Sequence, residues 1–171
     1  MKTLIISSSL SKNSKSFVLC KEVQNELLSK KASVTFIDAR NILINAYHHK
    51  DTEDKKWLSE LVKQSDNIII GMGIHCFSIS DNLKIIIDNC FENATGKFFG
   101  ILCAAGGQKS YLATQHLTQI CMNEWRMIQL PQVIYATSND FNDMELTSVE
   151  IKKRIKIFSN DFYSIGKKLL N

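Results

Sequence analysis

The sequence has no long apolar run, no cluster of basic residues and no signal peptide. None of its apolar stretches approaches the length of a membrane span. The strand-like segment after Met1 and Lys2 is too short for a secretory leader. Its net charge is only +4, with scattered lysines, whereas nucleic-acid binding needs a basic face. We therefore expect no membrane or nucleic-acid partner.

The cysteines also follow no recognisable pattern. They are odd in number, far apart and without a CxxC pair, which argues against a disulfide framework and a zinc knuckle. Their positions are Cys20, Cys76, Cys90, Cys103 and Cys121. The adjacent His48 and His49 lack the carboxylate–histidine spacing of a metal site. We expect no bound metal and a cytoplasmic location, where free thiols persist.

Short apolar runs instead alternate with amphipathic segments along the whole chain. The apolar runs predict strands at residues 3–7, 33–38, 66–72, 96–105 and 132–137. Helical spacing is found at residues 14–30, 53–65, 83–91, 110–123 and 147–170. Such alternation favours an α/β protein with a parallel sheet covered by helices on both faces. No repeat or linker interrupts it, so residues 1–171 are expected to form one domain. Five strands in a chain of this length suggest the strand order 2-1-3-4-5.

Three loops should then meet where the strand order reverses, beyond the carboxyl ends of the strands. We call residues 8–16 the first loop, residues 73–80 the second loop and residues 105–111 the third loop. The first is rich in hydroxyls, the second carries His75 and Phe77, and the third is rich in glycine. A phosphate at the first loop and a planar ring at the other two would form a mononucleotide pocket.

The first loop opens a helix, and this gives it two possible roles. The first backbone N–H groups of a helix lack intrahelical partners and attract anions, and Lys12 and Lys15 add positive charge. Serines are also common helix caps, so a capped helix with nothing bound remains an alternative.

Other nucleotide-binding motifs are absent or incomplete. There is no GxxxxGK[ST] sequence, which disfavours a Walker-type NTPase. Gly71 and Gly73 follow a strand, but the third glycine of GxGxxG is missing. An aspartyl-phosphate receiver would need acidic residues after the first strand, where this chain has serines.

A family resemblance supports the mononucleotide interpretation. Residues 8–16 read Ser-Ser-Leu-Ser-Lys-Asn-Ser-Lys-Ser. This is similar to Gly-Ser-Leu-Arg-x-x-Ser-x-[Asn/Thr], the first loop of the NADPH-dependent FMN reductase family, which is flavodoxin-like in fold. The resemblance implies that Ser9, Ser14 and Ser16 bind the FMN phosphate. Ser11 replaces the family arginine, with Lys12 as the nearest cation.

The other two loops resemble the same family in register. Residues 73–88 follow Pro-x-Tyr-Asn-x-Ser-x-x-x-x-Leu-Lys-Asn-x-Ile-Asp at Ser78, but Gly73, His75 and Cys76 depart from it. Residues 106–117 follow Gly-Gly-x-x-[Gly/Ser]-x-x-x-x-x-x-Leu. The flavin-binding residues that these matches imply are Gly73, Ile74, His75, Cys76, Phe77 and Ser78 in the second loop, and Ala105, Gly106, Gly107 and Gln108 in the third.

The resemblance implies a flavodoxin-like oxidoreductase that carries FMN and uses NAD(P)H to reduce flavin, quinone or another small acceptor. No catalytic side chain is expected, because the flavin carries the hydride chemistry. The resemblance also implies a homodimer or homotetramer, since family members commonly pair through the helix after the third strand. Two alternatives remain: an electron carrier without NAD(P)H turnover, and a binding protein that has lost flavin.

Three residue types also have simpler explanations. Phe77 would be a core residue or a subunit contact, and His75 a solvated loop residue. Gly106 and Gly107 would serve only a turn with positive φ.

Overall fold

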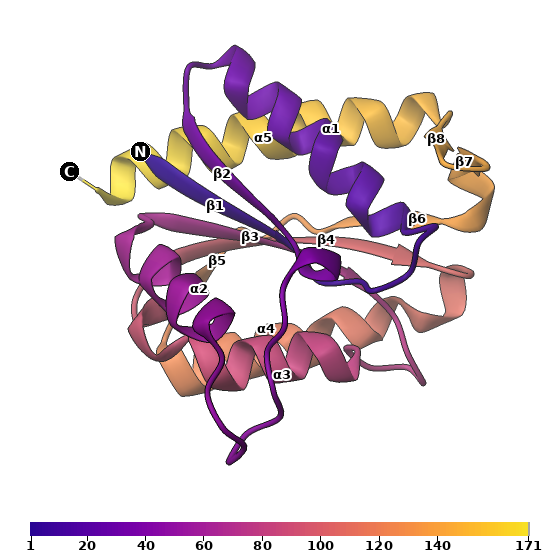
Figure 1. The fold of residues 1–171 in the computed structure, drawn as a ribbon. Coiled ribbons are helices and arrows are strands. Elements are labelled where there is room, and N and C mark those ends of the chain that lie inside the picture. Colours follow the sequence, from indigo (N-terminus) through magenta and orange to yellow (C-terminus); the bar gives the residue numbers. More distant parts are fainter. Residues whose placement is uncertain (171) are drawn as a thin grey trace.

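A single parallel sheet forms the centre of the computed structural model, which describes residues 1–170 (Figure 1). Its strands are β1 (Lys2–Ser7), β2 (Ser33–Asp38), β3 (Asn67–Gly73), β4 (Phe98–Ala105), β5 (Ile128–Gln129) and β6 (Ile134–Thr137). They run in the order β2-β1-β3-β4-β5, and β6 also pairs with β4. The predicted order 2-1-3-4-5 is therefore confirmed.

Next to β4, two short strands take the place of the single strand expected at residues 132–137. Strand β5 pairs with the start of β4 at Phe98 and Phe99, and β6 pairs with its end from Leu102 onward. Pro131, between the two pieces, has no backbone N–H to donate to the sheet. The proline explains why this position consists of two short strands.

Five α-helices of residues 1–170 cover the sheet, and they match the expected segments apart from their ends. They are α1 (Lys15–Ser29), α2 (Glu53–Gln64), α3 (Asp81–Cys90), α4 (Thr114–Trp125) and α5 (Val149–Leu169). Helices α1 and α5 lie on one face of the sheet, and α2, α3 and α4 on the other (Figure 1). Among residues 1–170, no helix is both long and apolar enough to cross a membrane.

Shorter elements complete the chain, and the sequence analysis did not foresee them. The 3₁₀ helices are η1 (Ala39–Asn41), η2 (Glu92–Ala94), η3 (Gln108–Ala113) and η4 (Ser138–Asp140). Because η3 precedes it, α4 begins later than residue 110. A small antiparallel hairpin, β7 (Phe141–Asn142) and β8 (Glu145–Leu146), joins the sheet to α5.

The strands are apolar on both sides because each face of the sheet packs against helices. In β3, Ile68 and Ile70 belong to the core under α2, α3 and α4, whereas Ile69 belongs to the core under α1 and α5. Gly71 lets α1 approach very closely, since a Cβ there would lie 2.1 Å from the Cys20 sulfur. This contact holds the first turns of α1 against the end of β3.

Candidate functional site

The three loops meet in one hollow of about 230 Å³ beyond the carboxyl ends of the strands. It is lined by Ser9, Ser11, Asn13, Ser14, Lys15, Ser16, Gly73, Ile74, His75, Ala104, Ala105, Gly106 and Ser138. Residues of the first, second and third loops, far apart in the sequence, are thus brought together.

Some residues expected in this pocket do not line it. They are Lys12, Cys76, Phe77, Ser78, Gly107 and Gln108. Cys76 and Phe77 form the exposed tip of a tight hairpin in the second loop. The Phe77 side chain is 67% exposed, which excludes a place in the core.

Other residues line the pocket although the sequence analysis did not select them, namely Asn13, Ala104 and Ser138. Ser138 directly follows β6, and its hydroxyl donates to the Gly106 carbonyl at 2.9 Å. The sheet topology could have indicated Ser138, because β6 ends at the same edge of the sheet as β1, β3 and β4.

In the first loop, hydroxyl groups build the start of α1. The Ser14 Oγ accepts the Phe17 backbone N–H at 3.1 Å and lies 3.1 Å from the Ser16 Oγ. Ser14 is therefore the helix cap, as the simpler alternative proposed. The first backbone N–H groups of α1 still have no intrahelical partner, so the capped end also suits an anion.

The first loop is also joined to neighbouring loops. Ser8 donates through its backbone N–H and its hydroxyl to the Gly71 carbonyl, at 3.0 and 2.8 Å. The Asn82 side chain at the start of α3 donates to the Ser8 carbonyl at 2.8 Å. These bonds fix the base of the pocket where β1 and β3 end.

Arg40 lies against the outside of the first loop, although no sequence motif points to it. Its Nη1 donates to the Lys12 carbonyl at 3.3 Å, and its guanidinium lies 4.4 Å from the centre of the Phe17 ring. Its Nη2 is 2.6 Å from the Asp38 carboxylate. Burial alone would raise the pKa of Asp38, but the hydrogen bonds from Arg40 hold it below its ordinary value. Arg40 thus braces the loop and does not line the pocket.

The third loop is held by side chains behind it. The Tyr135 hydroxyl donates to the Gly107 carbonyl at 2.7 Å and lies 3.0 Å from the Ser110 Oγ. Neither Gly106 nor Gly107 has positive φ, so the simpler alternative of a positive-φ turn is wrong. A Cβ at either glycine would meet no atom within 4 Å. The backbone therefore faces open space, which fits a flat ligand lying close to it.

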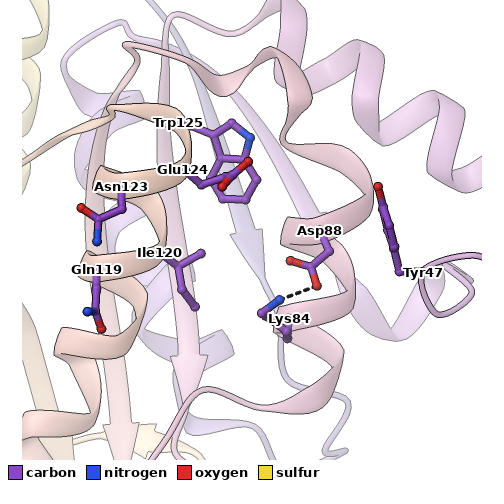
Figure 2. A pocket seen from close by; sticks show the side chains of 8 residues that line it. All are labelled: Tyr47, Lys84, Asp88, Gln119, Ile120, Asn123, Glu124 and Trp125. Atoms are coloured by element: carbon purple, nitrogen blue, oxygen red, sulfur yellow. Dashed lines mark hydrogen bonds and ion pairs between the residues drawn. The ribbon is translucent and has the colours of Figure 1, made fainter.

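A larger hollow of about 520 Å³ lies elsewhere, between α3 and α4 (Figure 2). Side chains of α4, among them Gln119 and Ile120, line one side, and the paired Lys84 and Asp88 of α3 line the other. Tyr47 lies beyond them. No glycine lines this groove, so the strand ends remain the better candidate for a nucleotide.

Comparison with known proteins agrees with this geometry. A family model described as NADPH-dependent FMN reductase matches residues 1–142. The chain belongs to this family. The match spans the elements that carry the first, second and third loops, and it confirms the resemblance drawn from the loop motifs.

Individual relatives are distant. An NAD(P)H-dependent FAD/FMN reductase of Geobacillus thermodenitrificans is 29% identical over 140 residues, 80% of this chain and 72% of that protein. The NADH-dependent FMN reductase SfnF of Pseudomonas fluorescens is 28% identical over 57% of this chain and 53% of its own length. The flavoenzyme NAD(P)H:acceptor oxidoreductase FerB of Paracoccus denitrificans superposes with a TM-score of 0.78 and 18% identity, over 98% of this chain and 97% of FerB. That similarity shows the fold.

Proposed function

We propose that the pocket at the strand ends binds FMN, with its phosphate at the first loop and its ring between the second and third loops. The observation that carries this proposal is that loops matching the family in three separate motifs line one hollow. At one end are Ser9, Ser14, Ser16 and the start of α1. At the other end the backbone at Gly106 is open.

As a member of its family, the chain is an NAD(P)H-dependent oxidoreductase with FMN as its cofactor. When bound, FMN supplies the hydride chemistry that joins NAD(P)H to a small acceptor. The acceptor that we propose is a free flavin, a quinone or a similarly small molecule. The work left to the protein is binding, orientation and electrostatics.

The third loop supplies part of that electrostatic work in this proposal. In a trans peptide the carbonyl and the next N–H point in opposite directions. The bonds from Ser138 to the Gly106 carbonyl and from Tyr135 to the Gly107 carbonyl therefore orient the N–H groups of Gly107 and Gln108. These bonds fix the shape of the loop, and we assign the N–H groups of Ala105 and Gly106, which line the pocket, to stabilise negative charge on the reduced ring.

We further propose that the protein acts in the cytoplasm as a homodimer or homotetramer paired through α3. The free thiols among residues 1–170 support a reducing compartment. The groove beside α3 supports the pairing surface, since exposed apolar side chains such as Tyr47 and Met122 lie on the elements around it. Sedimentation velocity tests this, and a monomer at all concentrations would exclude it.

A visible spectrum and an anaerobic titration test the main proposal. The purified protein incubated with FMN should keep the absorbance of bound oxidised flavin after gel filtration. Adding NADPH without oxygen should then bleach that absorbance, and adding a quinone should restore it. Absence of flavin bands would exclude FMN binding. Bound flavin that stays oxidised with both NADPH and NADH would favour the electron-carrier alternative.

A further inference from the structure

The hairpin of the second loop has an unusual backbone. The His75 N–H donates to the Ser78 carbonyl at 3.0 Å, and the Ser78 N–H donates to the His75 carbonyl at 2.8 Å. Between them, Cys76 has φ 48° and Phe77 has φ 58°. Positive φ at both central residues defines a type I′ turn, which asparagine and glycine favour. Cysteine and phenylalanine are poorly suited to it, so the turn needs support from outside.

Packing at the tip does not supply that support. Cys76 and Phe77 are both exposed. Among the hydrogen bonds of residues 1–170, one joins a side chain of this hairpin to another element. It lies between the Ser78 Oγ and the Nδ1 of His116 on α4, which are 2.9 Å apart. This bond links the second loop to the helix that follows the third loop.

The link lies next to the pocket. His75, at the other end of the same hairpin, lines the pocket together with Gly73 and Ile74. The two backbone bonds of the turn couple His75 directly to Ser78. A change in the position of Ser78 is therefore transmitted to His75, which lines the pocket.

We propose that His116 is a positioning residue that, through Ser78, holds the His75–Ser78 hairpin over the ring end of the flavin pocket. This inference rests on the proposed function, because it assigns the ring to that end. It makes His116 a determinant of affinity for the ring and leaves phosphate binding to the first loop.

His116→Ala removes the link without disturbing the helix. The residue is exposed, and the gain in helix propensity from alanine offsets the lost hydrogen bond, so the variant should fold with nearly the stability of the wild type. Affinity should fall about threefold to tenfold, the size of one net hydrogen bond. The loss should be equal for FMN and for lumiflavin, a ring without phosphate, when the apoprotein is titrated by flavin fluorescence.

Three companion variants separate positioning from other effects. His116→Asn keeps a hydrogen-bonding group near the position of Nδ1 and should restore most of the affinity. The double variant Ser78→Ala/His116→Ala should bind flavin no more weakly than either single variant, because both substitutions remove the same hydrogen bond. Gln115→Ala, at an exposed neighbour on the same helix, is the matched control and should change nothing.

Two results would overturn the proposal. One is unchanged lumiflavin affinity in His116→Ala, and the other is an equal loss in His116→Asn and His116→Ala. Both presuppose a wild-type protein that binds flavin. A wild type that binds neither FMN nor lumiflavin contradicts the proposed function itself, so the two failures are distinguishable.

Discussion

The first and second loops both line the pocket and are held in different ways. In the first loop, Ser8, Ser14 and Ser16 are buried and hydrogen-bonded. In the second loop, Cys76 and Phe77 are exposed and have left-handed backbone conformations. The proposed phosphate end is thus built into the fold, whereas the proposed ring end depends on a hairpin with little support.

The two loops also differ in how they match the family motifs. The first loop keeps the family serines at Ser9 and Ser14, whereas Ser16 replaces an asparagine or threonine and Ser11 replaces the arginine. The second loop departs from the pattern at Gly73, His75 and Cys76. The two ends of the pocket should therefore respond separately to substitution, and this can be tested with ligands that have or lack a phosphate.

The largest effect is expected from charge at the phosphate end. Ser14→Asp should raise the FMN dissociation constant by about a hundredfold or more, because a carboxylate about 4 Å from a phosphate repels it by about 4 kcal/mol at an effective dielectric constant near 20. Ser14→Asn is the matched control, since both residues are good helix caps. Flavin fluorescence measures the affinity. If FMN binds equally to both variants, the phosphate does not lie at the first loop.

A smaller effect is expected from filling the open space at the third loop. Gly106→Val should weaken the binding of lumiflavin and FMN by about tenfold, or 1.4 kcal/mol, because the valine side chain would occupy space assigned to the ring. Thermal stability should hardly change, since a Cβ there meets no atom within 4 Å. Gly106→Ala should give an intermediate loss. Full affinity in Gly106→Val would place the ring elsewhere.

The hairpin can be relieved of its unfavourable residues. Cys76→Asn combined with Phe77→Gly introduces the residues that a type I′ turn prefers, and it should increase the free energy of unfolding by about 1 kcal/mol. Urea denaturation measures the gain. Cys76→Ser alone should give none, because serine has no such preference. Equal stability of the double variant and the wild type would show that the turn is not strained.

The smallest effect is expected from the ion pair between Asp38 and Arg40, outside the first loop. The lowered pKa of Asp38 means that its pairing with Arg40 stabilises the fold above the unfolded pKa, near 4. That contribution disappears as the pH falls through the folded pKa. The stability difference between wild type and Asp38→Asn, about 0.5 kcal/mol, should be constant from pH 5 to 8 and shrink below about pH 4. A difference independent of pH would contradict this assignment.

Much of the fold could be predicted because its signals are local. The continuous apolar run at Ile68–Ile70 identifies a strand buried on both faces, and Ser14 identifies the start of a helix. The alternation of strands and helices predicts a parallel sheet, and five strands in a chain of this length suggest the order 2-1-3-4-5. The same reasoning placed three loops at one edge, and residues of all three line the pocket.

The features that could not be predicted from the sequence depend on contacts between distant segments. Arg40 reaches the first loop across 28 residues, and His116 reaches the second loop across 38. Neither residue belongs to a motif, and only the packing of β2 and α4 brings them to the site. The exposure of Phe77 likewise follows from backbone angles at the turn, which the residue types at that turn do not favour.

The burial of four of the cysteines has a practical consequence for labelling the protein with a dye. Burial raises the pKa of Cys90 to about 11 and that of Cys103 and Cys121 to about 12, and it raises that of Cys20 further still. These thiols stay protonated and shielded, whereas Cys76 lies in the open. A maleimide dye should therefore attach to Cys76 alone, without removal of any other cysteine. The natural sequence thus carries a single labelling position next to His75 of the pocket, where fluorescence would report hairpin movement directly.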